Sequence, residues 1–167
     1  METMSYLELF TVGKSFEAAI GEGSKSERLR IPKNMSRIHL SDEIIEYVEN
    51  ISETVNFLVT GEIWCPDFQI NISILKIFCD LNPNFNLSVI TMGRGKKYLS
   101  QLLGIEKDEL KYPTVAVLDA DFELVGTFFE RPQSVLACDF EEIKRPYYKG
   151  EYLNDSVLDF VEILKKF

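Results

Sequence analysis

One cysteine stands where an apolar strand is expected to turn directly into a helix. The apolar run of residues 55–63 leads into Trp64-Cys65-Pro66-Asp67-Phe68, and a segment with helical spacing of apolar residues follows at once. Pro66 suits the first position of a helix, because its missing N–H would have no intrahelical partner there. Cys65 is therefore predicted at a helix N-terminus, where unpaired backbone N–H groups and the helix dipole favour a thiolate. Such a thiolate is a candidate nucleophile toward disulfides.

The neighbours of Cys65 are expected to act on the thiol in different ways. If the helix N-terminus lowers the pKa of the thiol by one unit, roughly a quarter of it is ionised at neutral pH. Asp67 works against this by like-charge repulsion, although a carboxylate in the first turn also stabilises the helix. Trp64 is expected to pack beside the thiol, and Phe68 to form an apolar lip on which a partner docks.

The other two cysteines are not expected to pair with Cys65. Cys79 lies 14 positions further along the same helix, which places it roughly 21 Å away at about 1.5 Å per residue. A disulfide needs Cα atoms about 5.5 Å apart. Cys79 also falls in an apolar stripe, so we interpret it as a core thiol. Cys138 lies in residues 132–150, a segment that the sequence pattern does not assign.

The elements predicted around this turn alternate between strands and helices. Residues 66–81 form the central helix, and the final helix spans about 154–166. The expected strands are 55–63, 85–92, 115–118 and 122–129, with a short helix at 96–103. Before them we expect a helix over 3–20, an irregular segment over 28–35 because of Pro32, and a helix that begins at Ser41. Lys144-Arg145-Pro146 is expected to interrupt any helix in 132–150.

Three features in this order resemble the thioredoxin superfamily. The first is Trp64-Cys65-Pro66-Asp67, and the second is Tyr112-Pro113-Thr114, whose proline lies 48 positions after Cys65. The second resembles the cis-proline loop that lies beside the catalytic cysteine in this family and pairs with substrate backbone. The third is a hairpin with Gly126-Thr127-Phe128 followed by Glu130-Arg131-Pro132, which is similar to the ending of bacterial thioredoxin family proteins of about this length.

The resemblance covers residues 54–167 and implies an α/β, thioredoxin-like fold. This fold has a central mixed sheet of about four strands flanked by helices. Residues 1–167 are then one domain, in which 54–167 form the thioredoxin core and 1–53 an N-terminal helical extension. The resemblance also implies that Cys65 is catalytic and that the substrate is bound by a set of residues around it: Trp64, Pro66, Asp67, Phe68, Tyr112, Pro113 and Thr114.

Two departures from the family pattern alter the expected chemistry. Phe68 stands where a dithiol thioredoxin has its resolving cysteine, and Val59 stands where such proteins have a buried aspartate. An internal Cys-x-x-Cys disulfide is therefore excluded. Two functions stay open: a monothiol thiol–disulfide oxidoreductase that forms mixed disulfides through Cys65, and a redox-inactive interaction module that uses the groove beside Pro113 or the N-terminal helices. A thiol peroxidase is disfavoured, because no arginine and Thr/Ser motif precedes Cys65.

Composition excludes several other classes of function. The net charge of −9 argues against binding to nucleic acid or to anionic membrane surfaces. The first residues do not resemble a signal peptide and no apolar run reaches about 20 residues, so we expect a cytoplasmic protein. One histidine, His39, and no close cysteine pair predict no metal site, and no cofactor is expected. The expected partner is a protein disulfide or a low-molecular-weight thiol such as glutathione, whose anion Gly93-Arg94-Gly95-Lys96-Lys97 could help to bind. The oligomeric state is not indicated.

Overall fold

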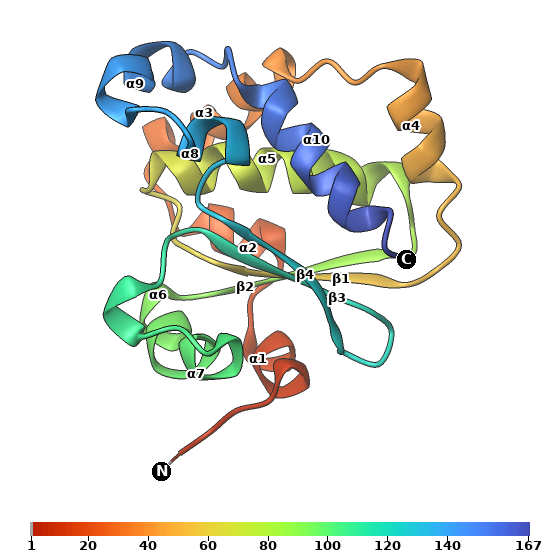
Figure 1. Ribbon diagram of the computed structural model, residues 1–167, viewed down its shortest axis with the longest axis vertical. Helices are drawn as coiled ribbons and strands as arrows, with labels where there is room; N and C mark the ends of the chain where they lie inside the picture. The colour runs from red at the N-terminus through yellow and green to blue at the C-terminus, as the bar shows by residue number, and fades with distance from the viewer. Residues whose placement is uncertain (1) are drawn as a thin grey trace.

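The strand that leads to Cys65 lies in the middle of the sheet. All six residues of β1 (Val55–Thr60) are buried, as expected for an apolar strand covered on both faces. The computed structural model describes residues 2–167, and within them the sheet has four strands in the order β2-β1-β3-β4 (Figure 1). β2 (Phe85–Ile90) runs parallel to β1, whereas β3 (Thr114–Leu118) is antiparallel to both β1 and β4 (Leu124–Phe129). The sheet is therefore mixed.

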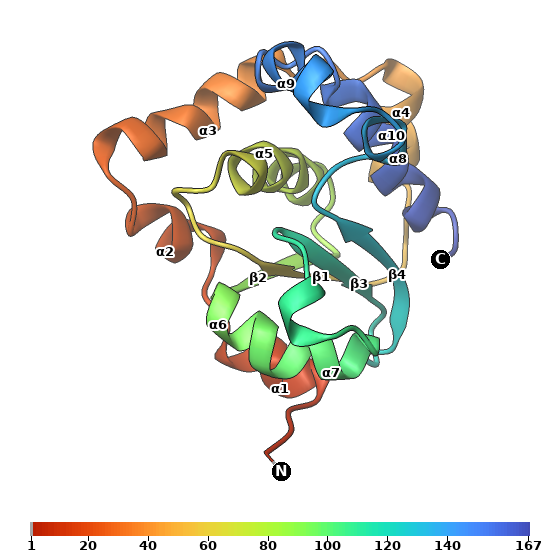
Figure 2. The same cartoon turned by 60° about the vertical axis from the view of Figure 1, so that its left-hand side comes forward.

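Helices cover the two faces of this sheet unequally (Figure 2). One face carries α5 (Pro66–Leu81) and, beside it against β4, α10 (Leu153–Leu164); α3 (Lys25–Arg37) and α4 (Asp42–Glu49) pack against α5. The opposite face carries the smaller helices α1, α6 and α7. The remaining bounds are α1 Tyr6–Val12, α2 Phe16–Gly21, α6 Met92–Arg94, a π-helical turn Gly95–Leu99, α7 Ser100–Leu103, a 3₁₀ turn Lys107–Glu109, α8 Gln133–Leu136 and α9 Phe140–Tyr148.

The alternation of β1 side chains divides the core into two clusters. Phe57 and Val59 pack into the larger cluster with α5, and Leu58 packs into the smaller cluster with Leu9 and Leu99. Successive side chains of a strand point to opposite faces of the sheet, so a continuous apolar run can fill both clusters. The α5 helix is buried on nearly every side in its first half, which explains why apolar residues occur on more than one side of it.

The fold class and the central elements predicted from the sequence are confirmed. The structure is an α/β fold with a four-stranded mixed sheet within residues 2–167, and α5 has the bounds predicted for the central helix. None of the helices among these residues is long and apolar enough to cross a membrane.

The N-terminal part of the chain differs from the prediction in two places. The single helix expected over 3–20 is two helices, because Lys14 leaves helical geometry to pair with Val89 at the edge of β2. The segment 28–35 is helical, since it belongs to α3. Ser24 and Glu27 start that helix with reciprocal hydrogen bonds. Pro32 removes only one intrahelical hydrogen bond.

The segment 132–150 also contains more helix than its sequence indicates. It forms α8 and α9, and Lys144-Arg145-Pro146 lies inside α9 rather than interrupting it. Pro146 stands near the C-terminal end of this nine-residue helix, where the loss of one hydrogen bond leaves most of the helix intact. Tyr147, one residue later, is buried and joins the larger core cluster.

Gly61 provides a test of the packing around the turn before Cys65. A Cβ atom at this position would overlap the ring of Phe68, which is fully buried. Gly61→Ala is therefore expected to lower the free energy of unfolding, measured with urea, by about 1–3 kcal/mol. Gly21→Ala is the control, because no atom lies within 4 Å of the added Cβ. Equal stabilities of the two variants would show that the turn can move away from Phe68.

Candidate functional site

Four chain segments meet at one edge of the sheet. Thr60, the last residue of β1, pairs with Thr114, the first residue of β3, and lies in register with Ile90 at the end of β2. Thr114 in turn pairs with Phe129 at the end of β4. The turn with Cys65, the Tyr112-Pro113 loop and the segment after β4 therefore all leave the sheet at this edge. Clefts and ligand sites of open α/β sheets commonly lie at such an edge.

Cys65 occupies the N-cap position of α5, as the sequence predicts. Its backbone is extended (φ −82°, ψ 121°), and its carbonyl accepts the first hydrogen bond of the helix, from Gln69 N at 3.0 Å. Its own N–H donates to the carbonyl of Glu62 at 3.0 Å, which closes the turn. The side chain is partly buried. The thiol is thus held at the start of a sixteen-residue helix.

The environment of Cys65 raises the pKa of the thiol, contrary to the expectation from the helix N-terminus. Partial burial is the largest cause, because it disfavours the charged thiolate. The backbone N–H groups of Phe68 and Asp67 oppose this effect, but the negative charges of Asp67 and Glu130 add to it. Burial and the two carboxylates therefore raise the pKa of the thiol more than the helix N-terminus lowers it. The thiol is mostly protonated at neutral pH.

Trp64 and Phe68 lie differently from the sequence prediction. Phe68 has 0% exposure and packs in the larger core cluster, so it cannot form a docking lip for a partner. The reason is its direction: the position points inward from the first turn of α5 against Gly61. Trp64 is instead 57% exposed, and it is the large apolar side chain that the turn presents to solvent.

Asp67 is engaged by an arginine that sequence reasoning did not connect with it. Arg131 donates through Nε to Oδ1 of Asp67 at 3.2 Å and through Nη2 to Oδ2 at 3.0 Å. The hydroxyl of Tyr148 also donates to Oδ2, at 3.1 Å. The Asp67 side chain is only 7% exposed and that of Arg131 16%. The Asp67 carboxylate is therefore engaged in a buried, bidentate ion pair and is not available to bind a substrate.

Arg131 connects this ion pair with the segment after β4 and with α9. Its Nη1 lies 3.1 Å from Oε1 of Glu130, and its guanidinium stacks on Phe140 at 3.5 Å from the ring centroid. Burial opposes the charged form of Arg131, but the hydrogen bonds and negative charge of Asp67 raise its pKa overall. The same surroundings raise the pKa of Tyr148 to about 12, chiefly through burial. We call Asp67, Glu130, Arg131 and Tyr148 the Arg131 cluster.

Glu130 is fixed by its backbone as well as by its side chain. It has a positive φ of 64°, which is uncommon for a residue other than glycine. Its N–H donates to the carbonyl of Pro113 at 2.7 Å, and its carbonyl accepts from Nδ2 of Asn71 at 3.0 Å. Asn71 Nδ2 also donates to the carbonyl of Asp67 at 2.9 Å. These bonds fix the segment after β4 between the Pro113 loop and the first turns of α5.

The Pro113 loop, residues 112–114, is mostly buried within the protein. The Tyr112–Pro113 peptide bond is cis. Pro113 and Thr114 are buried, and the Thr114 hydroxyl donates to the carbonyl of Lys111 at 2.6 Å. The Tyr112 side chain is partly exposed, and its hydroxyl lies 3.4 Å from the carbonyl of Met92. Of the residues expected to bind substrate, Trp64 and Pro66 are exposed and Tyr112 is partly exposed, whereas Asp67, Phe68, Pro113 and Thr114 are buried.

The other cysteines do not complete a redox pair with Cys65. Among residues 2–167 all three cysteines are free. Burial raises the pKa of Cys79 to about 12, in agreement with its interpretation as a core thiol. Cys138 is exposed just after α8, where its Sγ lies 3.3 Å from the carbonyl of Ser134. Within the same range, no group of three or more histidine, cysteine, aspartate or glutamate side chains is arranged to hold a metal ion.

The sequence contained a partial signal for the Arg131 cluster. Glu130-Arg131-Pro132 was recognisable as the ending of the hairpin, and Asp67 as the acidic residue of the first helical turn. Because β4 ends at the same sheet edge at which α5 begins, an arginine just after β4 can reach that carboxylate. Tyr148 could not be found in this way, since its helix was not assigned.

The chain matches a protein family described as "Thioredoxin" over residues 13–143. A crystal structure of a protein of unknown function from Pseudomonas aeruginosa is similar to it, with a TM-score of 0.89, 35% sequence identity, and coverage of 97% of this chain and 98% of that one. The crystal structure of an HIV epitope scaffold gives the same TM-score and identity, with 98% and 99% coverage. No functionally curated protein matches this chain.

The buried ion pair predicts a strong coupling between Asp67 and Arg131. Arg131→Met leaves the Asp67 carboxylate buried without its charge partner, so the free energy of unfolding is expected to fall by about 3–5 kcal/mol. The double variant Asp67→Asn/Arg131→Met is expected to lose less than the sum of the two single variants. Urea unfolding of the full double-mutant cycle measures this.

The exposed pair of Lys165 and Glu162 supplies the control for this cycle. Lys165→Met is expected to leave the free energy of unfolding nearly unchanged, because exposed ion pairs contribute little. Additive effects of Asp67→Asn and Arg131→Met would contradict a coupled pair.

Proposed function

The chain belongs to the thioredoxin family, and we propose that within it the protein is a monothiol thiol–disulfide exchange protein that forms mixed disulfides through Cys65. The observation that carries this proposal is the position of the partly exposed Cys65 thiol at the N-cap of α5, at the sheet edge from which the Pro113 loop also leaves. Exposed Trp64 beside it offers an apolar surface to the molecule that carries the disulfide.

The exchange uses one protein sulfur and two external ones. The Cys65 thiolate attacks one sulfur of a disulfide R–S–S–R′, the S–S bond breaks, and R′–S⁻ leaves and takes up a proton. The product is a mixed disulfide between Cys65 and R–S. An external thiolate then attacks the R sulfur, forms a new external disulfide and releases Cys65 as a thiolate. No net oxidation of the protein occurs, and no second cysteine of the chain is required.

The raised pKa of Cys65 limits the rate of this reaction. At neutral pH few molecules carry the thiolate, so capture of a disulfide is slow. A thiolate of higher pKa is a stronger nucleophile but a poorer leaving group. The mixed disulfide is therefore released slowly as well, which suits a protein that holds a partner for some time more than one that turns over rapidly.

A protein disulfide is favoured over glutathione as the partner. The cations expected to help bind an anionic thiol are already occupied: Lys96 pairs with Asp108 at 2.8 Å, Lys97 with Glu2 at 3.0 Å, and Arg94 donates to the carbonyl of Val12. The carboxylate of Glu130 near Cys65 also disfavours an anionic substrate. In the cytoplasm, the location expected from the sequence, a pool of small thiols would supply the external thiol of the second step.

The alternative function is a redox-inactive interaction module on the same fold. Its supporting observation is that two carboxylates, those of Asp67 and Glu130, act against ionisation of Cys65. In that case Trp64 and the surface around Tyr112 hold a partner without a covalent bond. Reactivity at a pH where the thiol is ionised separates the two functions.

Disulfide capture is expected to follow the ionisation of Cys65. In the Cys79→Ser/Cys138→Ser background, the rate of adduct formation with the neutral reagent 2-hydroxyethyl disulfide, read by intact mass, should rise about tenfold per pH unit below the pKa of the thiol. Cys65→Ser should abolish the adduct. If Cys65 forms no adduct even at a pH above its own pKa, the protein is an interaction module.

Glu130→Gln is expected to accelerate the same reaction at neutral pH. Removing a negative charge near the thiol favours the thiolate and so lowers the pKa of Cys65, and the rate should rise roughly two- to threefold. Glu106→Gln changes the net charge equally at an exposed position and should leave the rate unchanged. Equal rates for both variants would mean that Glu130 does not act on the thiol.

A further inference from the structure

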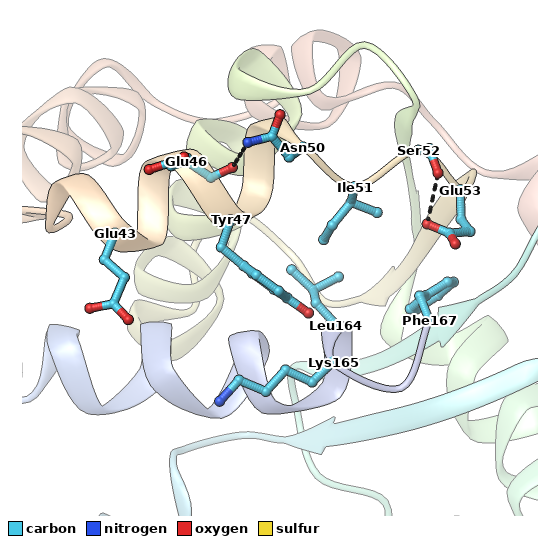
Figure 3. A pocket seen from close by; sticks show the side chains of 10 residues that line it. All are labelled: Glu43, Glu46, Tyr47, Asn50, Ile51, Ser52, Glu53, Leu164, Lys165 and Phe167. Atoms are coloured by element: carbon cyan, nitrogen blue, oxygen red, sulfur yellow. Dashed lines mark hydrogen bonds between the residues drawn. The ribbon is translucent and has the colours of Figure 1, made fainter.

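A groove separates α4 from α10 on the outer side of the helical layer. Both helices pack on α5, and Figure 3 shows Tyr47 extending from α4 toward α10, where its hydroxyl end lies beside Leu164. Two adjoining hollows of about 620 and 410 Å³ form the groove, and both are lined by Glu43, Tyr47 and Lys165. The first hollow extends toward Phe167 and the second toward Asn154. We call this surface the α4–α10 groove.

The floor of the α4–α10 groove is apolar and partly uncovered. Tyr47 is 36% exposed and Leu158 is 44% exposed, although both are large side chains that stabilise a structure when buried. Ile44, Val161 and Leu164 continue the floor between them. Burying this floor under a partner would remove apolar surface from water, which is the main driving force for association.

The rim of the groove is acidic. Glu43, Glu46 and Glu53 line it from the side of α4 and the segment after it, and Glu162 lines it from α10. Among the described residues that line the groove, Lys165 is the one cation, and it already pairs with Glu162 at 2.8 Å. The pKa of Lys165 is raised, first by Glu162 and then by Tyr47 and Glu43, so Lys165 stays a cation in this lining. The lining therefore has excess negative charge.

We propose that the α4–α10 groove binds a cationic amphipathic helix of a partner protein. The apolar side of such a helix would cover Tyr47 and Leu158, and its lysines or arginines would face Glu43, Glu46 and Glu53. The acidic rim argues against the other occupants. A second copy of the chain would bring its own acidic groove against this one, and nucleic acid or an anionic membrane would be repelled.

The walls of the groove favour a helix over an extended peptide. An extended peptide gains affinity by pairing its backbone with an open strand edge. The groove offers no such edge among its lining residues, because α4 and α10 satisfy their backbone groups internally. A helix also satisfies its own backbone groups and can lie between two others through side chains alone. The eight residues of α4 span about 12 Å, so two to three helical turns fill the groove.

The groove lies at the opposite end of β1 from Cys65. Ile51 to Glu53, at one end of the groove, precede the first residue of β1, whereas the turn with Cys65 follows its last residue. A helix bound between α4 and α10 therefore leaves Cys65 accessible. The inference does not depend on the redox activity of Cys65.

The probe for this groove is a synthetic peptide of about four helical turns that places leucines on one face and lysines on the other. Its binding to the full chain is measured by fluorescence anisotropy at low salt. A matched peptide in which glutamates replace the lysines should not bind. Glu43→Gln/Glu46→Gln is expected to weaken binding of the lysine peptide about fivefold or more, and Leu158→Ser should also weaken it.

The control variant Glu106→Gln/Glu109→Gln changes the net charge by the same amount at exposed positions outside the groove. It should bind the lysine peptide as the unaltered chain does. Equal weakening by both double variants would overturn the proposal, because the attraction would then be general. Absence of binding, or a dimer of the chain that Leu158→Ser dissociates, would overturn it as well. Circular dichroism checks that each variant is folded.

Discussion

The bidentate ion pair between Asp67 and Arg131 is the interaction on which the architecture around Cys65 depends. It joins three parts of the chain that are distant in sequence: the first turn of α5, the segment after β4, and α9 through Tyr148. A buried carboxylate is costly unless it is paired and hydrogen-bonded. Asp67 therefore requires Arg131, and the requirement fixes where the segment after β4 lies. Glu130 is brought beside the Pro113 loop as a consequence.

Partial burial is the main reason why the helix N-terminus does not activate Cys65, and the charges around the Asp67–Arg131 pair add to its effect. One guanidinium serves two carboxylates, Asp67 and Glu130, so negative charge is left near the thiol. This charge adds to the larger effect of burial, and together they raise the pKa of Cys65. In a dithiol thioredoxin a second cysteine would follow in the first turn, but Phe68 fills the core instead. The turn thus keeps the thioredoxin shape with a single cysteine, whose thiol is mostly protonated at neutral pH.

The sequence predicted the parts of the fold that depend on local patterns. Apolar spacing and Pro66 defined α5 to the residue, and three short motifs in the correct order carried the resemblance to the thioredoxin superfamily. The prediction that residues 28–35 are irregular was wrong. A proline such as Pro32 usually ends a helix, but the capping box at Ser24 stabilises the start of α3 and the helix continues past Pro32. Phe68 was misplaced because spacing alone does not show which way a residue in the first helical turn points. The Arg131 cluster depends on a contact across 64 residues, which no local pattern reveals.

The proposed behaviour of the site depends on the suppression of Cys65 ionisation by its surroundings. The most direct measurement is an NMR titration of the Cβ chemical shift of ¹³C-labelled Cys65 in the chain with Cys79 and Cys138 replaced by serine. We expect a pKa above the ordinary value of about 8.5. A pKa below about 7.5 would show that the helix N-terminus dominates, and it would contradict an effect of burial, Asp67 and Glu130 on the thiol.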